Sequence, residues 1–216
     1  MLRTLGHPIS FLGLVAGFVV GIFVLHYAQV WVARLLGDRV ALRAGHDLRR
    51  AIDPFGAVAA AISVPGWGSL ADTNLRSTGR RAAALLAGPL AAAAVGLVAL
   101  AGYLGLGGPP VEVGPGDLLG GAPFPAAQSF LLCAGVESIG VAVLSLVPLP
   151  PLTGWRLLQL ASANTLGWQR ARYWLEERNI GVVILLVLLI FPLGRSGPLL
   201  VELVNAITRP LTGLLP

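Results

Sequence analysis

Residues 9–36, with the sequence ISFLGLVAGFVVGIFVLHYAQVWVARLL, form an apolar run of 28 residues whose one permanently charged side chain is Arg34. An α-helix rises 1.5 Å per residue, so about 20 apolar residues cross the hydrocarbon core of a bilayer. The run is long enough to span a membrane and too long for a removable signal peptide. We therefore expect it to be retained as the first membrane helix.

The composition of the whole chain points the same way. Of its 216 residues, 56% are hydrophobic and 12% are charged, and the mean hydropathy is +0.80. Soluble domains carry about 25% charged residues, so this chain has too few to cover its apolar surface. The composition predicts an integral membrane protein. Its one cysteine, Cys133, excludes a disulfide framework and a zinc site built from cysteines.

The remaining apolar stretches predict an all-α polytopic bundle that forms a single membrane domain, residues 1–216. Two further runs have spanning length, 82–106 and 126–147, and a fourth, 180–193, is marginal. The apolar stretch 54–66 is too short to span and is bracketed by Pro54 and Pro65-Gly66. It therefore predicts a re-entrant element that enters the membrane and returns. We expect a cytoplasmic surface segment over 151–179 and an apolar C-terminal tail over 196–216.

The arginines predict an orientation. All fifteen basic residues are arginine, against ten acidic residues, which gives a net charge of +5. They gather in residues 34–50, 67–81 and 151–179, whereas 107–125 contain none. Short arginine-rich loops stay in the cytoplasm, so topology explains this charge and no nucleic-acid partner is expected. We expect the cell (inner) membrane as location, with the N-terminus outside and the arginine-rich loops cytoplasmic.

Several short motifs follow one another in a specific order. They are His26 near the end of the first run, Ile52-Asp53-Pro54-Phe55-Gly56 and Gly66-Trp67-Gly68 around the re-entrant stretch, Leu86-Ala87-Gly88-Pro89-Leu90 in the second run, and Val147-Pro148-Leu149-Pro150-Pro151-Leu152-Thr153-Gly154 after the third. In order and spacing this set resembles the site-2 protease family of intramembrane zinc metalloproteases. The resemblance covers roughly residues 10–195.

The resemblance implies a fold with a site-2 protease-like core, and it also implies a degenerate active site. In that family a His-Glu-x-x-His motif gives two zinc ligands and a general base, and an aspartate in a Pro-x-Pro-Pro-Leu-Asp-Gly stretch gives the third ligand. Here His26 matches the first ligand. Tyr27 stands at the base position, Val30 at the second ligand and Thr153 at the third. Catalytic zinc needs three protein ligands, so we expect no catalytic residue, no metal and no cofactor.

The function expected from this resemblance is that of a pseudoprotease, a binding or scaffolding subunit of a membrane protein complex. Its partners would be other membrane proteins or transmembrane helices, within the lipid bilayer. Glu137, in the middle of the third run, and Trp155 are the candidate partner-binding residues. Glu137 is expected either to meet a partner or to bond inside the bundle, to Ser138, Ser145 or a neighbouring helix.

Two other functions remain open. The chain could be an active intramembrane zinc metalloprotease with an unusual ligand set, such as His26, His46 and an aspartate. Zinc is expected only in that case. It could also be a cofactor-bearing membrane subunit in which His26 is the axial ligand of a haem or pigment. For His26 itself the sequence favours a hydrogen bond within the bundle over a ligand role.

Overall fold

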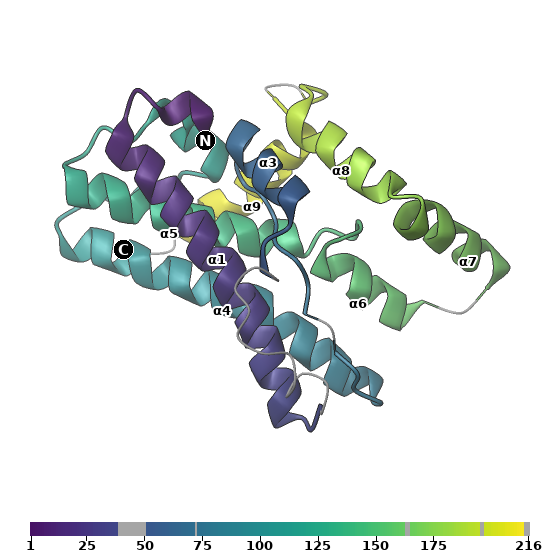
Figure 1. The fold of residues 1–216 in the computed structure, drawn as a ribbon. Coiled ribbons are helices and arrows are strands. Elements are labelled where there is room, and N and C mark those ends of the chain that lie inside the picture. Colours follow the sequence, from purple (N-terminus) through teal and green to yellow (C-terminus); the bar gives the residue numbers. More distant parts are fainter. Residues whose placement is uncertain (39–50, 72, 163–164, 195–196, 214–216) are drawn as a thin grey trace.

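The computed structural model describes residues 1–38, 51–71, 73–162, 165–194 and 197–213, and within these residues the chain is helical and forms no strand. Three of the described helices are long and apolar enough to cross a membrane: α1 (Pro8–Leu35), α4 (Thr78–Gly105) and α5 (Ala126–Ser145). Each of the three packs along the other two (Figure 1). The prediction of a helical membrane bundle is confirmed.

Glycines let the backbones of this bundle approach closely. A Cβ atom on Gly17 of α1 would lie 2.8 Å from Cα of Ala134 in α5, and one on Gly96 of α4 would lie 2.7 Å from the carbonyl oxygen of Gly135. In lipid no hydrophobic drive holds helices together, so close packing of small residues stabilises their association. The glycines of the apolar runs therefore determine how closely α1 and α4 pack on α5.

Replacing Gly17 with alanine tests this packing. The added methyl group would overlap the backbone of Ala134, so we expect a loss of about 1–3 kcal/mol in the free energy of unfolding in detergent. Gly6→Ala is the matched control, because a Cβ atom there has no neighbour within 4 Å in the described structure. Equal stability of the two variants would show that the contact between α1 and α5 is not close.

The stretch predicted to be re-entrant is a short helix followed by a return segment. Helix α3 (Pro54–Ile62) begins at Asp53, whose carboxylate accepts hydrogen bonds from the backbone amides of Phe55 and Gly56 at 2.8 and 3.2 Å. After Ser63 the chain turns back, and Gly68 pairs with Ile52 in an isolated antiparallel bridge. Nine residues of helix cannot cross a bilayer, and the position of α3 within a membrane stays a prediction.

The remaining described elements up to residue 190 are η1 (Leu2–Thr4), η3 (Pro115–Gly120), α6 (Thr153–Ala161), α7 (Leu166–Arg172), η4 (Tyr173–Glu177), which is a π-helical turn, and α8 (Ile180–Ile190). Of these, η1 and η3 lie where no element was expected, α6, α7 and η4 lie within the segment 151–179, and α8 matches the marginal run 180–193 except at its end. Helix α8 ends at Ile190, before the expected residue 193, since Phe191 precedes a proline and is extended. Helix α4 begins at Thr78, before the apolar run at 82, so Arg80 and Arg81 lie in its first turn.

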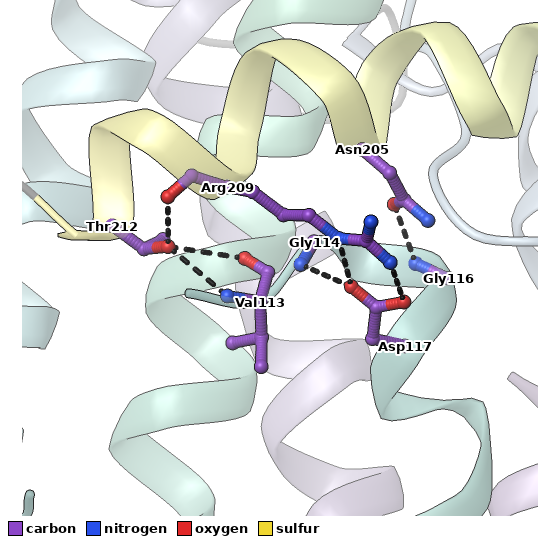
Figure 2. Close-up of polar contacts among 7 residues, drawn as sticks. All are labelled: Val113, Gly114, Gly116, Asp117, Asn205, Arg209 and Thr212. Atoms are coloured by element: carbon purple, nitrogen blue, oxygen red, sulfur yellow. Dashed lines mark hydrogen bonds and ion pairs between the residues drawn. The ribbon is translucent and has the colours of Figure 1, made fainter. Parts of the chain in front are cut away.

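The segment expected as an apolar tail contains an amphipathic helix, α9 (Leu199–Gly213), which packs on α5 and η3. Figure 2 shows the polar face of α9 against the segment before α5. Arg209 donates two hydrogen bonds to the Asp117 carboxylate, at 2.9 and 2.6 Å, and Asn205 accepts one from the amide of Gly116 at 3.1 Å. Thr212 bonds both backbone groups of Val113, each at 3.2 Å. These contacts fix α9 to the loop between α4 and α5.

The ion pair between Asp117 and Arg209 makes stability depend on pH. Partial burial acts to raise the pKa of Asp117, but hydrogen bonds from Arg209 and from the Gly114 amide outweigh it and hold the pKa below its ordinary value. A carboxyl whose pKa is lower in the folded state stabilises the fold above its unfolded pKa, about 3.9, and this contribution is lost as pH falls through the folded value.

We expect Arg209→Gln to lower the free energy of unfolding by about 0.5–1 kcal/mol at pH 7, a modest amount because both side chains are partly exposed. The variant should also lose less stability than the wild type when pH falls below about 4. Thermal unfolding in detergent from pH 7 to pH 3 measures both effects. Arg170→Gln, which replaces an exposed arginine of α7, is the control. Parallel pH profiles for the wild type and Arg209→Gln would contradict the assignment.

Candidate functional site

One turn after His26, the side chain of Gln29 is completely buried and joins α1 to three other segments. Its amide nitrogen donates to the carbonyl oxygen of Leu85 in α4 at 3.1 Å and to the hydroxyl of Thr153 at the start of α6 at 3.2 Å. Its oxygen accepts from the backbone amide of Ala71, in the return segment after α3, at 3.2 Å. Both N–H groups of the amide and its oxygen are thus engaged.

Two glycines of the quoted motifs make room for this junction. A Cβ atom on Gly88 would lie 2.8 Å from Cγ of Gln29 and 2.7 Å from the carbonyl oxygen of Leu25, so α4 can cross α1 here only without a side chain. A Cβ atom on Gly154 would lie 2.6 Å from the carbonyl oxygen of Val147. The proline-rich turn therefore folds tightly onto the end of α5. This fold brings Thr153 against α1.

His26 is held by the same return segment. Its Nδ1 lies 3.0 Å from the carbonyl oxygen of Ser69, which can only accept, so Nδ1 is the donor. The ring of Tyr27 meets the His26 ring edge to face, with 5.8 Å between centroids. His26 thus has the hydrogen bond within the bundle that the sequence favoured.

The structure brings three of the four positions of the implied zinc site to the same part of α1. Thr153 contacts α1 at Gln29, His26 contacts Ser69, and Val30 is buried in the apolar cluster that contains Ala71. Tyr27 instead lines an apolar groove of about 530 Å³ that runs along α1 beside Phe23 and Trp31, and Val30 reaches its edge. Among the described residues, no three His, Cys, Asp or Glu side chains lie together as they would around a metal ion. His46, named in the alternative ligand set, lies outside the described residues.

Glu137 is completely buried in α5, and neither carboxyl oxygen has a hydrogen-bond partner among the described residues. The predicted bond to Ser138 or Ser145 is wrong. The Ser138 hydroxyl donates across to the carbonyl oxygen of Gly17 at 3.0 Å, and that of Ser145 donates to its own helix, to Ala142, at 2.7 Å. Glu137 has no exposed surface, and its contact with a partner protein stays a prediction.

Trp155, the other candidate, lines a groove of about 250 Å³. One wall is the entry to and return from α3, with Asp53 and Ser69, and another is the turn Pro150-Pro151. Residues of η4 and α8 form the opposite wall of the groove. The indole of Trp155 packs on Trp168, with 5.3 Å between centroids, and its Nε1 is buried without a hydrogen-bond partner in the described structure.

The charged rim of this groove is organised around Glu176. Its carboxylate lies 3.4 Å from Arg156 and 3.6 Å from Arg172, and it accepts a hydrogen bond from Gln159 at 2.9 Å. These contacts tie η4 to α6.

Sequence reasoning missed Gln29 because it falls at a variable position of the His-Glu-x-x-His pattern. The signal available was its chemistry: it is the one side-chain amide in the apolar run 9–36. An amide in a membrane span needs hydrogen-bond partners from other segments, and such a residue marks where helices meet.

A scan against models of protein families finds none that matches the chain, and searches among curated proteins and among solved structures find no match either.

Proposed function

We propose that this membrane protein is a catalytically inactive relative of the site-2 proteases that acts as a binding or scaffolding subunit of a membrane protein complex. The observation that carries the proposal is the Gln29 junction. In the site-2 protease pattern, an aspartate at position 153 would stand beside two histidines. In this chain Thr153 instead bonds to the side-chain amide of Gln29, whose N–H groups and oxygen are all engaged. A zinc ion needs three ligands with free lone pairs, and a valine at position 30 provides none.

The groove at Trp155 supports the binding part of the proposal. Its walls combine an indole and two prolines with hydroxyl, amide and carboxylate groups, from Ser69, Asn179 and Asp53. Aromatic and apolar side chains beside polar and charged ones are typical of protein–protein interfaces with a polar rim. The partner we propose is the part of another membrane protein that leaves the bilayer beside the return segment.

A contact between the end of α1 and the start of α4 supports the orientation with the arginine-rich loops in the cytoplasm. Arg80, in the first turn of α4, donates to the carbonyl oxygen of Leu36, just after α1, at 3.5 Å. The arginine-bearing end of α1 therefore lies beside the arginine-bearing start of α4. By the positive-inside rule this end of the bundle is cytoplasmic, in a cell (inner) membrane with the N-terminus outside.

The test is association with a partner in the native membrane. A photo-crosslinking amino acid at Val182, which lines the groove, should trap a defined membrane protein, and the same probe at Val98, 73% exposed on α4, should not. Ser69→Phe fills the groove and should abolish that crosslink, whereas Val98→Phe should leave it unchanged. Persistence of the crosslink in Ser69→Phe would overturn the binding site.

A second measurement addresses the proposed inactivity. The purified chain, kept free of chelators, should contain much less than one zinc per chain and show no visible absorbance. One zinc per chain would favour the metalloprotease alternative, and a visible band lost in His26→Ala would favour the cofactor alternative.

A further inference from the structure

A second cavity of about 200 Å³ lies where α4 begins, next to the groove at Trp155, with which it shares Leu70 and Arg156. Thr73 of the return segment forms one wall, Arg81 and Leu85 of α4 a second, and Arg156, Gln159 and Leu160 of α6 a third. Figure 1 shows α6 beside the first part of α4, and the two helices are in contact.

Two guanidinium groups face this cavity. Nε of Arg81 donates to the carbonyl oxygen of Leu75, which fixes the direction of the side chain, and within the described structure no contact engages its two terminal nitrogens. Arg156 is 49% exposed, and one of its terminal nitrogens lies 3.4 Å from the Glu176 carboxylate and donates to the amide oxygen of Gln159 at 3.5 Å, which, among the described residues, leaves its other nitrogens for a ligand. None of the described lining residues is acidic, and Thr73 and Gln159 add a hydroxyl and an amide. The lining is therefore built for a negatively charged group.

The start of α4 adds to this positive charge. Ser77 stands at the N-cap without a side-chain hydrogen bond, and the first turn holds no acidic residue but contains Arg80 and Arg81. The N-terminus of a helix carries a partial positive charge and prefers anions nearby, yet here the sequence places two cations. An anion in the cavity would relieve this repulsion and accept hydrogen bonds from the terminal nitrogens of Arg81.

The volume and the apolar walls of the cavity indicate which anion fits. The cavity has about the volume of six or seven water molecules in the liquid, enough for one phosphate group with a few attached atoms. Guanidinium groups bind phosphate oxygens in pairs. Leu85 and Leu160 provide apolar surface beside them. We propose that this cavity binds a phosphate group, carried either by a phospholipid headgroup or by a small soluble phosphate.

The experiment titrates the purified full chain in a neutral detergent with three probes: dioctanoyl phosphatidylglycerol, dioctanoylglycerol, which lacks the phosphate, and inorganic phosphate. Binding of phosphatidylglycerol but not of dioctanoylglycerol or inorganic phosphate identifies a lipid headgroup site. Binding of inorganic phosphate identifies a site for soluble phosphates. In both cases affinity should fall as salt is raised. If none of the probes binds, the proposal is overturned.

Variants link the binding to the cavity. Arg81→Gln and Arg156→Gln should each weaken the binding about tenfold or more, because each removes charge-assisted hydrogen bonds to phosphate. Leu160→Trp should weaken it by filling the cavity while leaving both arginines in place. Arg170→Gln removes an exposed arginine outside the cavity and should leave the affinity within about twofold of wild type. Wild-type affinity in both Arg81→Gln and Leu160→Trp would overturn the proposal.

One more variant tests how a nearby negative charge affects phosphate binding. Asp72 is next to Thr73 in the chain and lies outside the described residues. Asp72→Asn removes a negative charge near the cavity in sequence, so it should leave phosphate binding unchanged or strengthen it. A loss of binding in Asp72→Asn, with unfolding temperature unchanged, would contradict an anion site formed by the two arginines.

Discussion

Replacing Gln29 with leucine should lower the free energy of unfolding by about 3–5 kcal/mol. The change leaves the amide of Ala71, the carbonyl oxygen of Leu85 and the hydroxyl of Thr153 buried without their partner. Each buried polar group that loses its hydrogen bond costs about 1–3 kcal/mol. Unfolding of the purified protein in detergent, by heat or by denaturant, measures the loss.

Thr153→Val is the matched comparison for that result. It removes one of the three contacts and leaves Gln29 bonded to Leu85 and Ala71, so we expect a loss of about 1 kcal/mol. The double variant should be little less stable than Gln29→Leu alone, because the two residues share a contact. A cost for Gln29→Leu no greater than that for Thr153→Val would show that the junction does not hold the four segments together.

Restoring the residues of the zinc site should give the protein a bound zinc ion. The triple variant Tyr27→Glu, Val30→His and Thr153→Asp restores the residue types of the site-2 protease pattern. We expect this variant to bind about one zinc per chain and the wild type to bind none. Histidines at positions 26 and 30 would share a helix face, and Thr153 already contacts α1 one turn after His26. Metal analysis after dialysis against a weak chelator gives the stoichiometry.

His26→Ala within the triple variant is the control, and it should lose the zinc because only two ligands remain. A triple variant that folds but binds no zinc would argue that position 153 does not lie where the protease resemblance places the third ligand. One zinc in the wild type would argue against an inactive protein.

The membrane bundle could be predicted from the sequence because its signal is local. Length and hydropathy of the runs around Gly17, Gly96 and Ala134 suffice to predict spanning helices, and the structure has three such helices in its described part. Helix ends were predicted less well where polar residues continue a helix, as Arg80 and Arg81 do in α4.

The contacts that define the sites could not be predicted, because they join distant parts of the chain. Arg209 and Asp117 are 92 residues apart, and Gln29 and Thr153 are 124 apart. Hydropathy patterns report only neighbours along one helix. The error at Glu137 has the same origin: Ser138 follows it in sequence but points about 100° away around the helix, toward α1, where it bonds to Gly17.

The separation of Gln29 from its partners has a consequence for how the protein is made. Ala71, Leu85 and Thr153 follow Gln29 by 42, 56 and 124 residues, so the ribosome has not yet supplied them when α1 is ready to leave the insertion machinery. An amide facing hydrocarbon alone is unfavourable by several kcal/mol. We therefore expect α1 to stay beside the insertion channel until α4 emerges, so that the Gln29 amide is not exposed to lipid without a partner. The two helices should then enter the lipid together.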